Sequence, residues 1–184
     1  MISIDAKEIE KAKSLLKNYP QQVIAAAASA INRTSAMVKT EVSKTIRKNY
    51  LISAKDIKST LSIKRASRLK LTGMISSIGQ APLITAFRVR AYKKGPVRVQ
   101  VMKKNKPKPV LGLFIGSSLK GYVGAMQRKN LSMRYPLRIP HGPSVPQMFS
   151  ADRSMSVIAP FAEKTLNHRF LHEISYRYGK FGGR

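Results

Sequence analysis

Residues 21–49 constrain the fold more than any other stretch, because they combine helical composition with helical spacing. The stretch contains neither glycine nor proline and is rich in residues that favour helices. Its apolar and small side chains recur every three or four positions, which places them on one face of a helix. The residues of this stripe are Val23, Ala27, Ala30, Ile31, Thr34, Val38, Val42 and Ile46. At about 1.5 Å per residue the predicted helix is roughly 43 Å long and would act as a spine.

Two features near the beginning of this helix refine the prediction. Asn18 fits the N-cap position, and Pro20 is tolerated in a first turn. The small residues 25–28 allow another helix to approach closely. Packing against residues 152–178 of the same chain is favoured over a subunit interface.

Three further segments have helical spacing. Residues 3–17 predict a short amphipathic helix, and Ser53, followed by an acid three positions later, resembles a capping box for a helix over 54–59. Residues 152–178 predict a last helix that needs a kink or a restart at Pro160. The apolar set predicted for this last helix is Val157, Phe161, Leu166, Phe170, Leu171 and Ile174.

Between the helical segments, polarity alternates as it does in β-strands. The candidate strands are residues 61–64, 69–71, 74–78, 87–91, 97–101, 110–115 and 121–127. The pair 87–91 and 97–101 is joined by turn residues and predicts a hairpin. One face of the hairpin would carry Phe87, Val89, Val97, Val99 and Val101, and the other Arg88, Arg90, Arg98 and Gln100.

The chain is strongly basic. It has 35 Lys and Arg against eight Asp and Glu, a net charge of +27. Residues 21–150 hold 25 of the basic residues and only two of the acids. Such an excess repels itself unless an anionic partner or an assembled neighbour compensates it. Nucleic acid is the first candidate partner, an acidic protein surface is the second, and a merely solvated basic face is the alternative.

The candidate contacts with DNA or an acidic partner lie in the hairpin and in the basic loop 103–109, where each neutralised phosphate would add salt-dependent affinity. They are Arg88, Arg90, Arg98, Lys103, Lys104, Lys106 and Lys108. Tyr92 is the one aromatic residue near these charges, so stacking on single-stranded bases is poorly supported. The alternative is an edge strand that its charges protect from aggregation.

Residues 134–149 hold four prolines and predict an extended, turn-rich connection rather than a regular helix. Such a segment orders at low entropic cost, which suits docking to a neighbouring subunit. The alternative is a rigid loop that covers the chain's own core. The candidate docking residues are Tyr135, Pro136, Pro143, Val145, Pro146, Met148 and Phe149.

The composition predicts no catalytic site, no cofactor and no metal site. There is no cysteine, the acids are scattered, and no Gly-rich phosphate loop occurs. His168 and His172 are four positions apart with Glu173 adjacent, which resembles metal-ligand spacing, but a third ligand is not identifiable. No stretch approaches the roughly 18–20 apolar residues of a membrane span, and no secretory signal is recognisable. We therefore expect a protein that is not an enzyme and is made in the cytoplasm.

Several short motifs occur in a characteristic order. The Ala-rich helix carries Ala30-Ile31-Asn32-Arg33-Thr34, and its basic continuation reaches Lys64-Arg65-Ala66. The later motifs are Ala125-Met126-Gln127-Arg128, Arg134-Tyr135-Pro136-Leu137 and Gly142-Pro143-Ser144-Val145-Pro146-Gln147-Met148-Phe149. In this order, over residues 20–178, they resemble the phage minor tail protein Z family of lambda-like phages and prophages.

The resemblance implies a structural virion protein that completes the tail at or near the end that joins the head. It implies a homo-oligomeric ring, six-fold, around the DNA channel, with tail-tube, tail-terminator or neck proteins as partners. It carries over no catalytic residues. The charge alone supports an alternative, a free sequence-nonspecific DNA-binding protein. A nuclease is a weaker third interpretation, because few acids are available to bind a metal.

The expected architecture is a single α+β domain over residues 1–178, with the long N-terminal and C-terminal helices packed on a small, mainly antiparallel sheet. Around this framework we expect an N-terminal helical extension at 1–20, a basic loop at 103–109, a Pro-rich connection at 134–149 and a flexible tail at 179–184.

Overall fold

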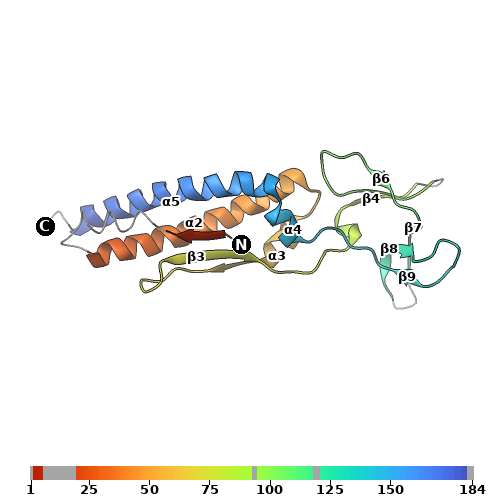
Figure 1. Cartoon of the computed structure of the whole chain (residues 1–184), viewed down its shortest axis with the longest axis horizontal. Coiled ribbons are helices and arrows are strands. Elements are labelled where there is room, and N and C mark those ends of the chain that lie inside the picture. Colours follow the sequence, from red (N-terminus) through yellow and green to blue (C-terminus); the bar gives the residue numbers. More distant parts are fainter. Residues whose placement is uncertain (1, 6–19, 93–94, 118–120, 182–184) are drawn as a thin grey trace. The chain divides into compact units, whose positions relative to one another are not determined.

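The computed structural model describes residues 2–5, 20–92, 95–117 and 121–181, and Figure 1 shows the order of its elements. Two long helices occur together with small antiparallel sheets, which confirms the predicted α+β class. Contacts divide the chain into two compact units: unit 1 within Met1–Thr45, Leu61–Ile78 and Phe149–Arg184, and unit 2 within Ile46–Thr60 and Gly79–Met148. The single domain expected over residues 1–178 stays a prediction.

Unit 1 combines two long helices with a three-stranded sheet. The helices are α2 (Pro20–Asn49), whose last turn belongs to unit 2, and α5 (Asp152–Phe181), and they lie side by side (Figure 1). The sheet has the order β1-β3-β2 and both of its strand pairs are antiparallel. Its strands are β1 (Ile2–Asp5), β2 (Leu61–Lys64) and β3 (Thr72–Ser77).

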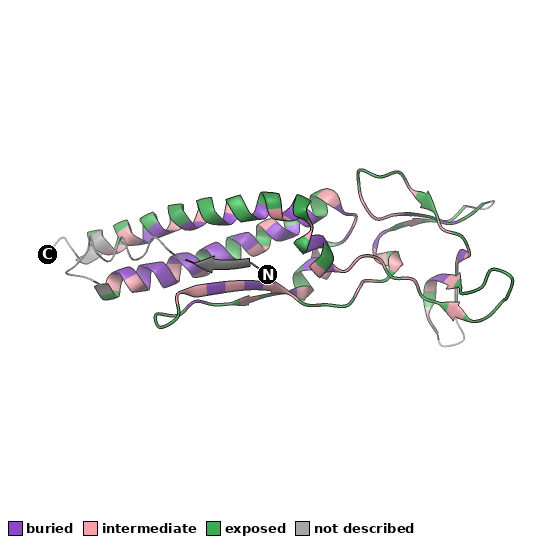
Figure 2. Ribbon diagram, viewed as in Figure 1, coloured by how far each residue is buried: buried purple, intermediate pink, exposed green. Residues whose placement is uncertain are grey.

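Helix α2 is the predicted spine. It begins at Pro20, in agreement with the prediction for its first turn, whereas the predicted cap Asn18 lies outside the described residues. Every residue of the predicted stripe is at most 2% exposed, as the buried band along α2 shows in Figure 2. Ala25–Ala28 are also buried, and Ser29 beside them accepts a hydrogen bond of 3.1 Å from Arg177 of α5. Internal packing therefore accounts for the alanine patch.

Polar contacts fix the sheet of unit 1 and its flanking loop to α2. The side-chain amide of Asn32 donates to the Ala66 carbonyl at 3.0 Å and accepts from the Ala66 N–H at 2.8 Å. Further along the helix, the Lys39 ammonium donates to the Leu61 carbonyl at 2.8 Å. Each bond satisfies a backbone group at or beside the sheet with a helix side chain, so strand and helix are held in one register.

Helix α5 differs from the prediction in two ways. It runs unbroken through Pro160, which excludes the restart but not the kink that was the other alternative. It also reaches Phe181, so the predicted end at 178 is wrong and residues 179–181 of the expected flexible tail are helical. Its buried face is also shifted. Val157 and Leu171 of the predicted set are exposed. The buried positions are Ser154, Ile158, Ala162, Leu166, Phe170 and Glu173. Leu166 and Phe170 of the predicted set are buried as expected. Ser154, Ala162 and Glu173 present little or no apolar surface, so a search for large apolar side chains missed them and included Val157 and Leu171.

The helix predicted over residues 3–17 is wrong for the residues of it that the structure describes. Ile2–Asp5 form strand β1, which pairs with β3 in the register Ile2↔Ile75, instead of opening a helix. The pairing gives hydrogen-bond partners to the backbone groups along one edge of β3. This stabilisation comes from residues far apart in the sequence, so local helical spacing does not reveal it. The remainder of the predicted helix lies outside the described residues.

The candidate strand 69–71 is not formed either, because Ser67 and Lys70 close a turn through their backbone atoms at 2.9 Å.

Unit 2 contains two three-stranded antiparallel sheets. The first has the order β4-β5-β6, with β4 (Arg88–Arg90), β5 (Arg98–Gln100) and β6 (Lys108–Pro109). The second has the order β7-β8-β9, with β7 (Leu113–Ser117), β8 (Val123–Arg128) and β9 (Leu137–Arg138). Val97, Val99, Leu113 and Ala125 form a buried cluster that joins the two sheets, and the 3-10 helix Ile84–Ala86 (η1) packs against it. The predicted hairpin is confirmed by the pairs Arg88↔Gln100 and Arg90↔Arg98.

Two short helices begin at capping boxes in unit 2. Helix α3 (Ala54–Thr60) starts as predicted: the Ser53 hydroxyl accepts from the Asp56 N–H at 3.1 Å and donates to its carboxylate at 2.8 Å. Helix α4 (Val145–Ser150) was not expected, because the four prolines of residues 134–149 predicted an extended path. Ser144 and Gln147 form its capping box, with the Ser144 N–H donating to the Gln147 side chain at 2.9 Å. A proline in a first turn sacrifices no helical hydrogen bond, so Pro146 is compatible with this helix.

Candidate functional site

The charge of the chain is concentrated in unit 2. This unit holds eighteen Lys and Arg and one acid, Asp56, a net charge of +17, whereas unit 1 holds seventeen against seven, +10. Both ion pairs among the described residues, Arg33–Glu173 at 3.0 Å and Lys44–Glu41 at 3.6 Å, lie in unit 1. The cations of unit 2 thus have almost no carboxylate of their own unit to neutralise them.

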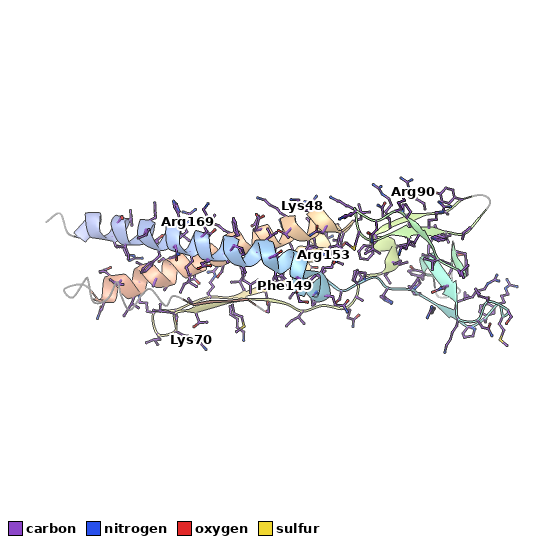
Figure 3. The ribbon with its side chains drawn as sticks, turned by 45° about the horizontal axis from the view of Figure 1, so that its top comes forward. Lys48, Lys70, Arg90, Phe149, Arg153 and Arg169 are labelled. Carbon is purple, nitrogen blue, oxygen red and sulfur yellow. The ribbon has the colours of Figure 1, made fainter. Side chains whose placement is uncertain are left out.

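Three of the predicted contact residues share one face of the first sheet. Strand pairing places Arg88, Arg90 and Arg98 on the side opposite Val89 and the buried Val99. All three arginines are exposed, and Figure 3 shows Arg90 at the surface of unit 2. We call these three residues the arginine face. Its central pair, Arg90 and Arg98, consists of like charges directly opposite each other, an arrangement that destabilises a sheet.

Neighbouring groups order this face. The Arg98 guanidinium lies 5.5 Å from the ring centroid of Tyr92, a cation–π distance. Gln100, on the same side of the sheet, donates from its side-chain amide to the carbonyls of Lys103 at 3.3 Å and Asn105 at 2.7 Å. The turn that carries the exposed Lys103 and Lys104 is therefore bonded to the arginine side of the sheet.

The structure separates two predicted lysines from this face. Lys108 is paired with Val99, so it lies on the opposite side of the sheet from the arginines. Together with Lys106 it lines a hollow of about 470 Å³. The other lining residues are mainly apolar: Tyr50, Ile84, Val99, Val101, Met102, Asn105, Val110 and Pro143. The seven predicted contacts therefore do not form one surface.

The predicted docking residues are divided as well. Tyr135 and Pro136 are exposed, and Pro143 and Pro146 are partly buried. Val145, Met148 and Phe149 are at most 2% exposed within the chain itself. These three side chains therefore serve the chain's own packing, which is the alternative that the sequence left open.

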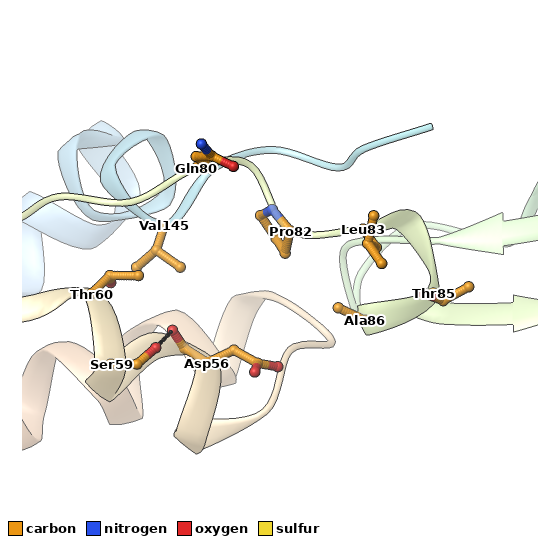
Figure 4. A pocket seen from close by; sticks show the side chains of 9 residues that line it. All are labelled: Asp56, Ser59, Thr60, Gln80, Pro82, Leu83, Thr85, Ala86 and Val145. Atoms are coloured by element: carbon orange, nitrogen blue, oxygen red, sulfur yellow. Dashed lines mark hydrogen bonds between the residues drawn. The ribbon is translucent and has the colours of Figure 1, made fainter. Parts of the chain in front are cut away.

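Unit 2 has a second hollow of about 460 Å³, and Asp56, the one acid of the unit, is among the residues that line it (Figure 4). Asp56 lines it together with hydroxyl-bearing residues, and the Ser59 hydroxyl donates to the Asp56 backbone carbonyl at 2.9 Å. Because Asp56 is the sole acid or base among the lining residues, the hollow offers no pair of groups for acid–base chemistry.

The two histidines of α5 are both exposed. Glu173 beside them is buried and turned toward Arg33 on α2. Among the described residues, no group of three His, Asp or Glu side chains is placed to hold a metal. Within the same part of the chain, the helices are too short or too polar to cross a membrane.

Comparison with known families identifies the class of protein. The sequence matches the family described as prophage minor tail protein Z (GPZ) over residues 6–178. The chain belongs to this family. Membership gives it a structural role in a phage tail, as a virion component that interacts with other tail or virion proteins. No curated protein and no solved structure matches the chain.

For a tail protein of the minor tail protein Z family, exposed apolar side chains are candidate assembly contacts, and sequence reasoning missed most of them. Leu131, Met133 and Tyr135 are each more than half exposed in the loop between β8 and β9. Leu111, close to the start of β7, is 71% exposed. The signal was present in the run from Leu131 to Tyr135, which places three large apolar residues at alternate positions of a loop.

Proposed function

We propose that the protein is a tail-completion component at the head-proximal end of the tail, needed for tail completion or head–tail joining. It forms a ring, six-fold, around the DNA channel. It acts without catalysis and without a cofactor. It assembles in the host cytoplasm with tail-tube, tail-terminator or neck proteins and stays in the virion. Family membership over residues 6–178 carries this proposal.

The charge distribution supports the proposal. A ring brings several copies of unit 2 close together, each with a net charge of +17. Like charges at this density repel unless DNA or acidic subunits lie between them. A position beside the genome channel supplies such anions.

Exposed residues of the β8–β9 loop supply a second line of support. Leu131, Met133, Tyr135 and the adjacent Pro136 present apolar surface to a neighbour, and Arg134 lies 5.9 Å from the Tyr135 ring. We assign subunit docking to this loop in place of the buried Val145, Met148 and Phe149.

Deletion of the gene from an inducible prophage tests the proposed role. After induction we expect heads and tails that are unjoined or joined without infectivity, counted by electron microscopy and by plaque assay. A plasmid copy of the gene should restore infectious particles, which controls for effects on neighbouring genes. Normal, fully infectious particles from the deletion strain would overturn the proposal.

The ring is tested separately on purified protein. Native mass spectrometry and negative-stain images of the protein, alone and with the tail-tube protein, should show a closed ring of six copies. A strictly monomeric protein under both conditions would contradict the ring while leaving the role in tail completion to the deletion experiment.

A free DNA-binding protein is the second candidate, favoured by the single acid among the charges of unit 2. The two candidates differ in where the protein is found after lysis. Mass spectrometry of gradient-purified virions should detect it at a fixed number of copies per particle. Its absence from virions and recovery with host DNA would favour the free DNA-binding protein.

A further inference from the structure

We propose that the arginine face of unit 2, formed by Arg88, Arg90 and Arg98, binds the phosphate backbone of double-stranded DNA without reading its sequence. The inference extends the proposed function, which places the protein beside the DNA channel, by naming the surface that meets the DNA. It also excludes Lys106 and Lys108 from that surface, because they line a hollow on the other side of the sheet.

The first argument is the pairing of like charges. Arg90 lies directly opposite Arg98, so their β-carbons are about 5 Å apart on the same face. The position opposite Arg88 is filled by Gln100, so no acid lies across from any of the three arginines. A pair of like charges costs stability in the isolated sheet and becomes favourable when an anion lies between the two guanidinium groups. The arrangement therefore fits a surface that binds an anion when the protein is assembled in the particle.

The second argument is the type of cation. Every cation that the described strands β4 and β5 carry on this face is an arginine, whereas the lysines lie in the loop after β5 and in β6. The guanidinium group is a planar fork that can give two hydrogen bonds to one phosphate. Tyr92 against Arg98 limits the freedom of that side chain before binding, so less entropy is lost when a phosphate is bound.

The third argument selects duplex DNA among the anions. Alternate residues of a strand are about 6.7 Å apart, so Arg88 and Arg90 form a regular row. A duplex presents one negative charge for about every 1.7 Å of its axis. The row of arginines can therefore contact phosphates at any position along the duplex. A single strand would be held by aromatic stacking, and the one aromatic ring described beside this face, Tyr92, is engaged with Arg98. An acidic protein surface would need carboxylates fixed at matching positions.

The test measures how DNA affinity depends on salt. Fluorescence anisotropy with the full chain and a labelled duplex of about 30 base pairs gives the slope of log K against log salt, which changes by about 0.9 for each phosphate contact. We expect the variant Arg88→Gln/Arg90→Gln/Arg98→Gln to reduce this slope by about 2 to 3. A second duplex of unrelated sequence should give the same values as the first.

The control removes equal charge elsewhere. Lys64→Gln/Arg65→Gln/Lys70→Gln changes three exposed cations of unit 1, and we expect it to leave the slope nearly unchanged. A separate readout keeps the proposal testable without DNA: Arg90→Gln should raise the thermal stability of the isolated protein, because it removes the like-charge pair with Arg98.

Three outcomes would overturn the inference. The arginine variant could keep the wild-type slope, both triple variants could lose the same slope, or the arginine variant could lose binding to a purified acidic tail protein while DNA binding stays intact. Any of these results leaves the proposed function standing if the deletion strain still fails to make infectious particles. Failure of the proposed function would instead appear as normal particles from that strain.

Discussion

At the scale of single residues, Gly73 marks the closest approach of β3 to α2. A β-carbon at this position would lie 2.6 Å from Cγ2 of Ile31 and 2.9 Å from the hydroxyl oxygen of Ser35. Both neighbours are fully buried, and the Ser35 hydroxyl donates to the Ile31 carbonyl at 2.8 Å. Ile31 is β-branched and has little rotational freedom, so the site cannot yield easily.

Gly73→Ala should therefore destabilise the protein by about 1–3 kcal/mol, the usual cost of overpacking a tight core. Urea unfolding followed by circular dichroism measures the change in the free energy of unfolding. Gly179→Ala is the matched control: apart from the backbone of α5 itself, no atom of the described residues lies within 4 Å of the added group, and a stabilisation of about 0.5–1 kcal/mol is expected. The same sign for both variants would contradict the close approach.

The residue scale also shows where sequence periodicity succeeds and fails. On α2 every residue of the predicted stripe is buried, because its members are apolar or small, although the helix also buries Ser35, Ser43 and Thr45, which the stripe did not include. On α5 the buried face includes Ser154 and Glu173, and the carboxylate of Glu173 is held by Arg33 of α2. A buried acid whose partner is far along the chain has no signal in the local pattern, so Val157 was chosen in place of Ile158.

At the scale of elements, α5 carries a proline far from its ends. Pro160 has no N–H to give to the carbonyl four residues earlier, and its ring crowds that carbonyl. Its side chain is exposed, so the proline contributes little packing to the core. Buried residues on either side, Ile158 and Ala162, hold the helix together across this position.

Pro160→Ala should stabilise the protein by about 1–3 kcal/mol, because it restores the missing hydrogen bond without loss of buried surface. Thermal unfolding by calorimetry would show a raised Tm. Pro146→Ala is the control, since Pro146 lies in the first turn of α4, where a helix does not use the N–H. An equal rise for both variants would mean that chain stiffness, and not the hydrogen bond, sets the effect.

Elements that depend on local chemistry were readable from the sequence, and those that depend on distant pairing were not. The capping box at Ser53 was identified, and the similar one at Ser144 and Gln147 was present but overshadowed by the neighbouring prolines. Strand β1 could not be recognised, since its partner β3 lies about 70 residues away in the register Ile2↔Ile75. Local spacing over 3–17 favoured a helix instead.

At the scale of the molecule, self-repulsion within unit 2 should govern stability at low ionic strength. The screening length of salt falls from about 30 Å at 0.01 M to about 8 Å at 0.15 M. With eighteen cations and one acid in the unit, added salt removes more repulsion than attraction.

We therefore expect the Tm of the full chain to rise as sodium chloride is increased from about 0.01 M to about 0.3 M. Differential scanning calorimetry measures the change. The variant Arg88→Gln/Arg90→Gln/Arg98→Gln should show a smaller rise, because three of the repelling charges are removed. A Tm that falls with salt would indicate that attractive ion pairs dominate.

The candidate site could be predicted only in part from composition. The excess charge and the arginines of the hairpin were visible in the alternating pattern. The division of the seven cations over two sides of the sheet was not, because it depends on β6 and on the pairing of Lys108 with Val99. The sequence predicted residues 103–109 as a loop. Strand β6 within it has only two residues, which is too short for an alternation of polar and apolar residues to be recognised.

The isolation of Asp56 has a consequence for how unit 2 responds to its surroundings. Between Asp56 and Asp152 the chain has no acidic residue, so acidification finds almost no carboxylate in this unit to protonate. Lysine and arginine keep their charge at every pH below about 10. Across acid and neutral pH only Asp56 and His141 can change the charge of the unit, so its eighteen lysines and arginines act as a nearly fixed ion exchanger. Whatever its charge holds can be released by salt or by a competing polyanion, but not by a change of pH.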